Sequence, residues 1–232
     1  MDELDRFAGF LAGRGTKWLE WFGAYSWRGA DADCGIRARF RLHRALTASL
    51  EPRAPAGAFP AAVGEILEWG GMRRLDDFDL DLTRATLTVL HTLGDDQFAV
   101  DHRQVFGRRI AATSKVYAMS DPRRWTIYDS RVGLAIQALV AAHLGDADLP
   151  ERLDFRQPPA RGDPPITPAQ ARRGFLRASR VLRQTAALLD VAGVPRPACA
   201  VGCADDTGGW QVYHLEMALF MLGRNGGDLG DG

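Results

Sequence analysis

Lysine is nearly absent from this sequence. Of 29 basic residues, only Lys17 and Lys115 are lysines. An arginine-biased genome would explain why arginine supplies the remaining basic charges. Lysine differs from arginine in that it can lose its proton and act as an amine nucleophile, so a lysine that persists in such a chain is a candidate for chemistry. For either lysine taken alone, chance is the simpler explanation.

Cysteine is also scarce, and its count is odd. The three cysteines, Cys34, Cys199 and Cys203, argue against a secreted disulfide scaffold and for a reducing compartment. The N-terminal segment opens with acidic residues and lacks a long apolar run, so we expect no signal peptide or membrane span there and a cytoplasmic location. Cys199, Cys203 and His214 are spaced too loosely to predict a metal site, and no glycine pattern for a phosphate or dinucleotide is present. We therefore expect no cofactor.

Net charge is absent as well, but the charges are segregated along the chain. The formal net charge of +0 argues against strong general attraction to nucleic acid. Residues 65–101 nevertheless carry nine acids, whereas 35–50 and 164–189 carry arginines and no acid. Such segregation gives one face of a neutral protein a positive field.

Strand signals are few, and the one at 125–128 is short. Apolar residues at helical spacing predict helices over 35–50, 59–69, 82–93, 103–119, 130–144, 167–191 and 210–222. We therefore expect an all-α fold, one domain over 1–222 in two helical lobes with a central cleft. The lobes would be about 1–50 plus 166–222, and 51–149, joined by the proline-rich segment 150–168. Residues 223–232 would form a flexible tail.

The stretch 108–132 carries the two residues that are the main candidates for chemistry, Lys115 and Asp129. Arg108 and Lys115 share a face of the helix predicted over 103–119, on a floor of alanines that would leave the lysine partly desolvated and lower its pKa. Asp129 is the predicted N-cap of the next helix, where backbone N–H groups favour an ionised carboxylate. Two consecutive helices joined in this way can aim the amine and the carboxylate into one cleft. Taken alone, Asp129 is more simply an ordinary N-cap.

The order of these residues resembles the helix-hairpin-helix DNA glycosylase superfamily, most of all its bacterial branch similar to 8-oxoguanine DNA glycosylases. The resemblance rests on Lys115 in SKVYAM and Asp129 in IYDSRV, and it covers about residues 100–145. The Gly-x-Gly that such hairpins carry before the lysine is replaced here by Ala112-Thr113-Ser114. The grip on a DNA phosphate must therefore come from nearby arginines or be absent.

The resemblance implies a fold and a reaction. It implies a two-lobed helical protein, a monomer, that binds double-stranded DNA and flips a damaged or modified base into a pocket. Asp129 would stabilise positive charge on the sugar, and Lys115 would attack the anomeric carbon, release the base and form a Schiff base that permits strand cleavage. If Lys115 is only structural, Asp129 would activate water. An oxidised purine in repair and a hypermodified base in phage DNA are both open as substrates.

The remaining candidate residues are positively charged or aromatic. The candidates for DNA contact are Arg108, Arg109, Ser114, Arg123, Arg124, Arg131, Arg177 and Arg180. The candidates for the base pocket are Trp18 and Trp21, from the aromatic cluster at 18–27, together with Tyr128 and Glu216. Aromatic clusters are more often core, arginine-rich helices are more often solvated faces, and we expect Glu216 to pair with a buried arginine.

Two other functions remain open. The chain could be a non-catalytic nucleic-acid-binding protein that kept a degenerate glycosylase scaffold, or a helical protein that binds a protein partner. A steep loss of affinity with salt distinguishes nucleic-acid binding from the second of these, because it reports phosphate contacts.

Overall fold

The all-α prediction is confirmed. A computed structural model describes residues 1–72, 78–92, 109–156, 158, 166–198 and 208–229. Within these ranges the chain forms helices and one isolated bridge, Trp27 to Ala30, and no strand. No helix in the described ranges combines the length and the hydropathy that a bilayer-spanning segment needs.

The helices follow one another with short connections. The first half contains α1 (Glu3–Ala12), α2 (Lys17–Gly23), α3 (Ala32–Ser49), α4 (Ala58–Trp69) and α5 (Leu80–Thr92). The second half contains α6 (Ile110–Ser120), α7 (Ser130–Leu144), the 3₁₀ turn η1 (Glu151–Leu153), α8 (Pro168–Val191) and α9 (Val212–Arg224).

Helix α7 begins and ends where its sequence signals place it. Asp129 is the N-cap, with its side chain accepting hydrogen bonds from the backbone of Arg131 and Val132, and Gly145 is the C-cap. Helix α8 begins at the predicted Thr167-Pro168 signal, because the Thr167 hydroxyl and Gln170 form a capping box.

Other boundaries differ from the predictions. Helices α1 and α2 were not predicted, although Asp2 and Asp5 form a capping box that starts α1. Helix α5 starts at Leu80, two residues before the predicted start at residue 82, because Asp79 accepts the capping hydrogen bond from Leu82. The predicted helix over 103–119 is observed from Ile110 onward, and its residues 103–108 lie outside the described ranges.

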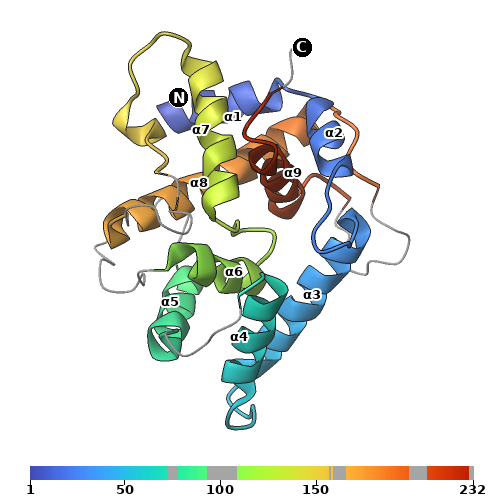
Figure 1. The fold of residues 1–232 in the computed structure, drawn as a ribbon, viewed down its shortest axis with the longest axis vertical. Coiled ribbons are helices and arrows are strands. Elements are labelled where there is room, and N and C mark those ends of the chain that lie inside the picture. The colour runs from blue at the N-terminus through green and yellow to red at the C-terminus, as the bar shows by residue number, and fades with distance from the viewer. Residues whose placement is uncertain (73–77, 93–108, 157, 159–165, 199–207, 230–232) are drawn as a thin grey trace.

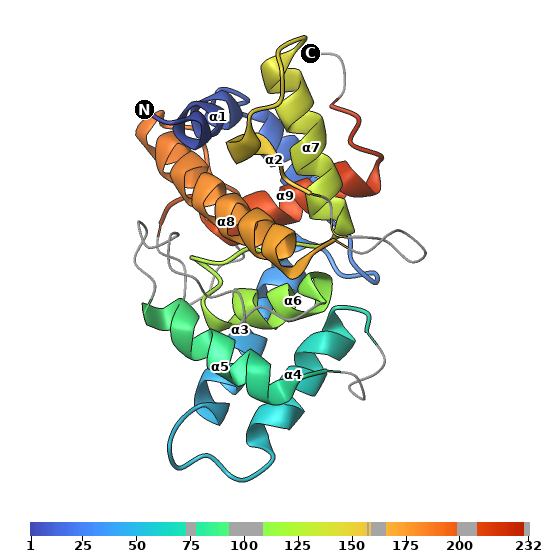
Figure 2. The ribbon, with the colours of Figure 1, turned by 90° about the vertical axis from the view of Figure 1, so that its left-hand side faces the viewer.

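The helices pack in two groups, which Figures 1 and 2 show above and below α6. Helix α7 packs against α9 and α1, α8 packs against α1 and α9, and α2 packs against α9. Helix α3 packs against α4 and α6, and α6 also contacts α4, α5 and α8. The lobes predicted from the sequence place α3 and α7 in the opposite groups, because chain order does not record which faces meet.

Two predicted irregular segments are partly packed. In the proline-rich connection, Leu153 and Phe155 are buried, so its start belongs to the core. The tail expected from residue 223 is still helical to Arg224, and Leu229 packs against the core.

One close crossing brings the start of α7 against α9. Helices α7 and α9 meet where Gly223 lies on the backbone of Arg131, so closely that a Cβ at residue 223 would overlap the Arg131 carbonyl. The absence of a side chain lets the two helices approach, and the start of α7 therefore lies against α9.

Candidate active site

Lys115 is buried although it carries an amine. It lies on α6 and only 7% of its surface is exposed. Its Nζ donates a hydrogen bond to the Ala111 carbonyl at 2.7 Å and lies 3.7 Å from Asp129 Oδ2. A Cβ at Gly70 would overlap Lys115 Cδ and lie 2.7 Å from Cε, so the end of α4 must carry glycine for the side chain to pass.

Asp129 faces the lysine from the N-terminus of α7. Its Oδ1 accepts hydrogen bonds from the backbone N–H groups of Arg131 and Val132, both at 3.1 Å. The other oxygen, Oδ2, is the one nearest Lys115. These two hydrogen bonds hold the carboxylate at the N-terminus of α7. The prediction that these helices aim Lys115 and Asp129 at one another therefore agrees with the geometry.

Ser114 fixes the distance between the two elements. Its hydroxyl accepts a hydrogen bond from the Tyr128 backbone N–H at 3.0 Å and lies 3.4 Å from the Tyr128 carbonyl, to which it donates. The Tyr128 hydroxyl donates in turn to the Arg156 carbonyl at 2.7 Å. These bonds join α6 to the extended segment that ends in Asp129, and they hold the amine and the carboxylate in register.

Burial determines the charge behaviour of the lysine. Desolvation lowers the pKa of Lys115, and the negative charges of Asp129 and Glu216 oppose that shift without cancelling it. An amine with a lowered pKa is unprotonated in a larger fraction of molecules near neutral pH, and the unprotonated amine is the nucleophile.

Lys115 and Asp129 open into one small cavity of about 60 Å³. Two further charged side chains, Arg131 and Glu216, reach the same cavity. The remaining walls are mainly aromatic and come from Tyr25, Trp27, Trp69 and Phe220. Charged groups enclosed by aromatic walls interact more strongly than they would in water.

Glu216 combines the two roles considered for it. It lines the cavity, and its Oε2 lies 2.5 Å from Nη2 of Arg39. The pair is almost inaccessible, with 1% of the Arg39 side chain and 3% of the Glu216 side chain exposed. Burial raises the pKa of Glu216, while the Arg39 guanidinium acts to lower it. The expected pairing with a buried arginine is therefore observed.

A strained turn carries the Trp27 wall. Trp27 and Ala30 exchange backbone hydrogen bonds around Arg28 and Gly29, both at positive φ (52° and 84°). Positive φ is costly for arginine, and the turn is held by bonds to the end of α4: Arg28 Nη1 donates to the Glu68 carbonyl and Trp27 Nε1 to the Trp69 carbonyl.

Arg131 lies over this wall. Its guanidinium carbon is 5.4 Å from the ring centre of Trp27 and 4.7 Å from that of Phe220. Cation–π contacts on both rings hold the side chain across the cavity, and an anion would compete with them.

Three of the four candidate base-pocket residues do not line the cavity. Trp18 is fully buried and its Nε1 donates to the Leu11 carbonyl at 2.8 Å, and Trp21 packs edge-on against Trp18. Tyr128 is fully buried against Gly174, where a Cβ would lie 2.6 Å from its ring. Trp18 and Trp21 lie away from the cavity because the segment 18–22 folds into α2 and packs against α9, and Tyr128 points instead toward α8 at Gly174.

The predicted DNA contacts differ in how far their side chains are exposed. Arg109 and Arg123 are exposed, and Arg124 and Arg131 are half-buried. Ser114 is fully buried in the tie described above, so it is not available to DNA. Arg108 lies outside the described residues.

The two candidates on α8 are engaged within the molecule. Arg180 forms ion pairs with Asp2 at 3.0 Å and Asp5 at 2.9 Å, and Arg177 donates to the Glu151 carbonyl at 2.7 Å. Arg180 therefore holds α1 on α8, and its prediction as a DNA contact is weakened by this pairing.

Sequence reasoning did not identify Arg39, Trp69 or Gly70. In the sequence, Arg39 is one of several arginines in 35–50, and Trp69 is the last residue of a predicted helix. Neither position by itself indicates a site. The predicted helix over 59–69 gave Gly70 no role beyond following its end, whereas the structure shows that Gly70 makes room for Lys115. A basic residue at an inward position of α3 was the available signal for Arg39, since Ile36 and Phe40 beside it are core.

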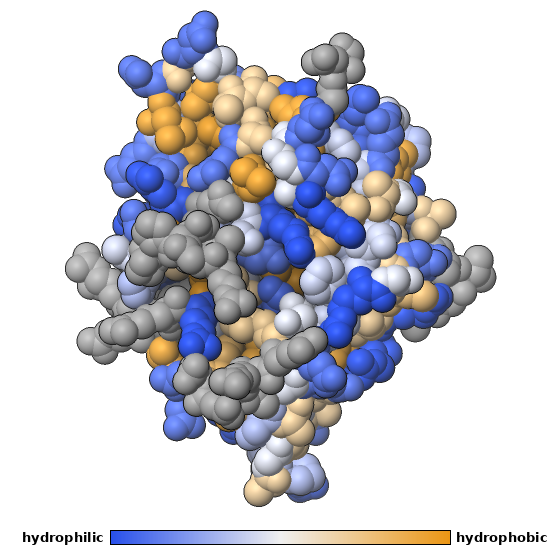
Figure 3. Space-filling model, viewed as in Figure 1, coloured by the Kyte–Doolittle hydropathy of each residue, from blue (hydrophilic) through white to orange (hydrophobic). Residues whose placement is uncertain are grey.

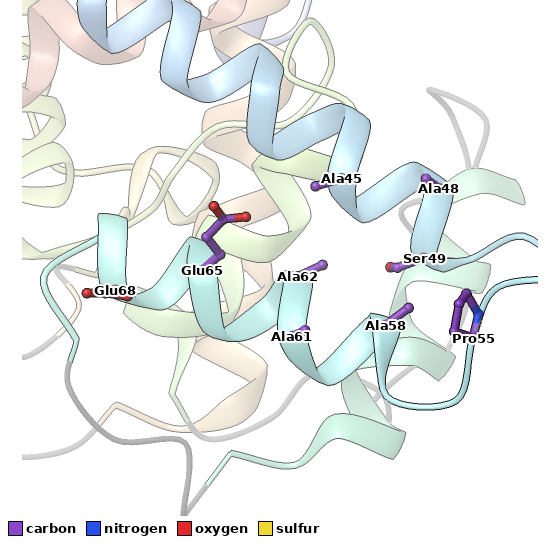
Figure 4. A pocket seen from close by; sticks show the side chains of 9 residues that line it. All are labelled: Ala45, Ala48, Ser49, Pro55, Ala58, Ala61, Ala62, Glu65 and Glu68. Atoms are coloured by element: carbon purple, nitrogen blue, oxygen red, sulfur yellow. The ribbon is translucent and has the colours of Figure 1, made fainter.

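A larger groove lies apart from these residues. It has a volume of about 570 Å³ between α3 and α4, and its floor is mostly alanine with Glu65 and Glu68 at one end (Figure 4). No predicted site residue lines it. On the face seen in Figure 3, hydrophilic side chains gather over the middle of the molecule.

Metal ligands do not gather in the part of the chain that the structure describes, where no three histidine, cysteine or acidic side chains could hold one ion. Cys199 and Cys203 lie outside that part. Comparisons of the chain with protein families, with curated proteins and with solved structures find no match.

Proposed function

We propose that the protein is a DNA glycosylase that excises a damaged or modified base, with Lys115 and Asp129 as its catalytic residues. The observation that carries the proposal is the buried amine of Lys115 at the edge of an aromatic-walled cavity. The amine lies 3.7 Å from the carboxylate of Asp129, which caps the N-terminus of α7. The resemblance of SKVYAM and IYDSRV to the helix-hairpin-helix superfamily supports the same assignment. Double-stranded DNA is the proposed partner, and the enzyme acts as a cytoplasmic monomer without a cofactor.

The chemistry assigns a different role to each group. Once a nucleotide is flipped, the unprotonated Lys115 amine attacks C1′ of the sugar and displaces the base. Asp129 stabilises the positive charge that develops on the sugar. The product carries the Lys115 nitrogen and the ring oxygen on C1′, and opening of the sugar ring at the C1′–O4′ bond gives a Schiff base with Lys115, from which the DNA strand can be cleaved.

The cavity must enlarge for this reaction. Its volume of about 60 Å³ is well below the roughly 300 Å³ at which ordinary ligand pockets begin. Most walls belong to packed helices, whereas Trp27 stands on a turn attached to α4 by two hydrogen bonds. We assign the entry to this turn, which would carry Trp27 away from Phe220.

The grip on DNA must come from arginines. The place of the usual glycine hairpin is occupied by Ala112-Thr113-Ser114 within α6. Arg109 stands exposed at the N-terminus of α6, and Arg123 is exposed in the loop between α6 and α7. Arg131 is the arginine nearest the cavity, where a phosphate would compete with its two aromatic contacts.

The proposal is tested with a panel of duplexes that carry oxidised, alkylated, deaminated or hypermodified bases. After incubation, hot alkali converts each abasic site into a strand break that a denaturing gel resolves. Asp129→Asn is the informative variant, since asparagine caps a helix about as well as aspartate, so the fold is retained while the charge is lost. We expect it to lose about a hundredfold to ten-thousandfold in rate on the duplex that the wild type cleaves.

The same panel separates the rival functions. Salt-sensitive binding to duplexes without release of any base would indicate a non-catalytic nucleic-acid-binding protein. No binding at low salt would leave a protein partner as the better explanation.

A further inference from the structure

We propose that Glu216 is a further catalytic residue, which relays the proton of the Lys115 ammonium to the departing base. The inference rests on the proposed glycosylase function and adds the group that handles the leaving base. It begins from the position of Glu216 on α9, the helix that faces α6 and α7 across the cavity.

The geometry places donor and acceptor on the walls of one small space. Lys115 comes from α6 and Glu216 from α9, and both line the cavity of about 60 Å³. That volume is about twice the share of one water molecule in the liquid, roughly 30 Å³, so a proton crosses it through one or two waters at most. Asp129 is already assigned to the charge that develops on the sugar, so Glu216 is the second carboxylate in the cavity that can carry the proton.

The buried ion pair is costly for the fold. Arg39 is 1% exposed, and within the described residues its Nε and Nη1 have no hydrogen-bond partner. Apolar residues of similar size at a buried ion pair are often as stabilising or more so, so the pair is better explained by chemistry than by stability. Arg39 stabilises the Glu216 carboxylate that remains after the proton has left.

The step balances in atoms and charge. A protonated Lys115 first gives one proton to Glu216, and the nitrogen electron pair freed in this way forms the bond to C1′. The C1′–N bond to the base breaks and its electron pair stays on the base, which takes the proton from Glu216. The net change moves one proton from the ammonium to the base and returns Glu216 to the carboxylate opposite Arg39.

The charged groups that face Lys115 determine the pKa that the methylation experiment follows. Asp129 and Arg131 face it from α7, and Glu216 faces it from α9. Burial raises the pKa of Tyr25, also in the cavity wall, to about 12, so this phenol stays neutral in the working range. Glu216 acts to raise the pKa of Lys115, so its removal lowers that pKa.

The first test needs no DNA. Formaldehyde with cyanoborohydride methylates unprotonated amines, and the chain has two lysines, so peptide mass spectrometry follows Lys115 against exposed Lys17 as internal reference. We expect Glu216→Gln to shift the pH midpoint of Lys115 methylation downward and to leave Lys17 unchanged. An unchanged Lys115 midpoint overturns the relay.

A second variant keeps the test informative if Glu216→Gln is too unstable to fold. Glu216→Gln leaves Arg39 buried without its partner, which typically costs about 3–5 kcal/mol. The double variant Arg39→Met/Glu216→Leu removes both charges, and the same direction of shift is expected, because Glu216 lines the cavity and Arg39 lies behind it.

The second test uses DNA with and without a leaving base. On the duplex that the wild type cleaves, both variants should release the base about a hundredfold to ten-thousandfold more slowly. On a duplex with a preformed abasic site no base leaves, so borohydride trapping should not be slowed, because the lowered pKa of Lys115 leaves more of its amine unprotonated. Wild-type excision by Glu216→Gln contradicts the relay. If the wild type neither excises nor traps, the glycosylase function fails, and the methylation midpoint alone decides whether Glu216 acts on Lys115.

Discussion

At the scale of single residues, the site depends on the absence of a side chain at Gly70. Lys115 reaches Asp129 through space that a Cβ at Gly70 would occupy. The backbone at Gly70 has φ −71°, which any residue can adopt, so the glycine is required by the close contact and not by its conformation.

We predict that Gly70→Ala displaces the amine and leaves the fold intact. The clash is with the flexible end of Lys115, so the unfolding free energy should change by less than about 1 kcal/mol. Methylation of Lys115 should change relative to Lys17, and excision should fall. Gly9→Ala, whose Cβ would meet nothing within 4 Å, is the matched control. Wild-type excision by Gly70→Ala would show that the position of the amine is not critical.

The sequence predicted the pair of Lys115 and Asp129 better than the aromatic residues that line the cavity. Lys115 and Asp129 are close in the chain, and one helix start between them limits where they can point. The walls come from distant segments, so Trp69 and Phe220 carry no local signal of their meeting. Trp18 and Trp21 were assigned to the pocket by aromatic crowding alone, which does not distinguish a core from a site.

At the scale of elements, the turn at residues 27–30 carries Trp27, one wall of the cavity. It is a short connection between α2 and α3 with arginine at positive φ, and two side-chain hydrogen bonds attach it to the end of α4. Such strained segments persist when their surroundings hold them, and they cluster at ligand clamps.

We predict that Trp27→Ala opens the cavity. The substitution removes one wall and the hydrogen bond to the Trp69 carbonyl, worth about 0.5–1.5 kcal/mol, so Lys115 should be methylated about twofold to tenfold faster. Lys17 should react at its usual rate. Trp21→Ala, which removes a tryptophan that does not line the cavity, should leave the Lys115 rate unchanged. Equal Lys115 rates in the two variants would remove the turn from the entry route.

Helix limits could be predicted where a side chain caps the backbone. Asp129 and Thr167 give α7 and α8 their observed starts. The signal for α1, the Asp2–Asp5 capping box followed by buried Leu4, Phe7 and Leu11, was present but masked by the acidic opening of the chain. Which helix packs on which could not be predicted, because it depends on contacts such as that of Gly223 with Arg131.

At the scale of the whole molecule, part of the arginine excess is used internally. Arg152 and Arg180 hold Asp2, and Arg39 holds Glu216, so these charges are neutralised within the fold. The positive field expected from charge segregation therefore depends on arginines that remain exposed, among them Arg109 and Arg123.

We predict that Arg123→Glu weakens DNA binding and lowers the slope of log affinity against log salt by about one, the value for one lost phosphate contact. Arg53→Glu, in the α3–α4 loop at the far end of the molecule, should leave the slope unchanged (Figure 1). Arg180→Glu should instead lower the unfolding midpoint, because it places a third carboxylate beside Asp2 and Asp5. Equal slopes for Arg123→Glu and Arg53→Glu would place DNA elsewhere.

The central claim is that Lys115 is the nucleophile, and borohydride trapping tests it most directly. With a duplex that carries an abasic site, borohydride should reduce the Schiff base and leave a covalent protein–DNA adduct. The two lysines supply their own control. The wild type and Lys17→Arg should both give the adduct, and Lys115→Arg, which keeps the charge but not the titratable amine, should give none. An adduct that persists in Lys115→Arg, or its absence in the wild type, would contradict the account.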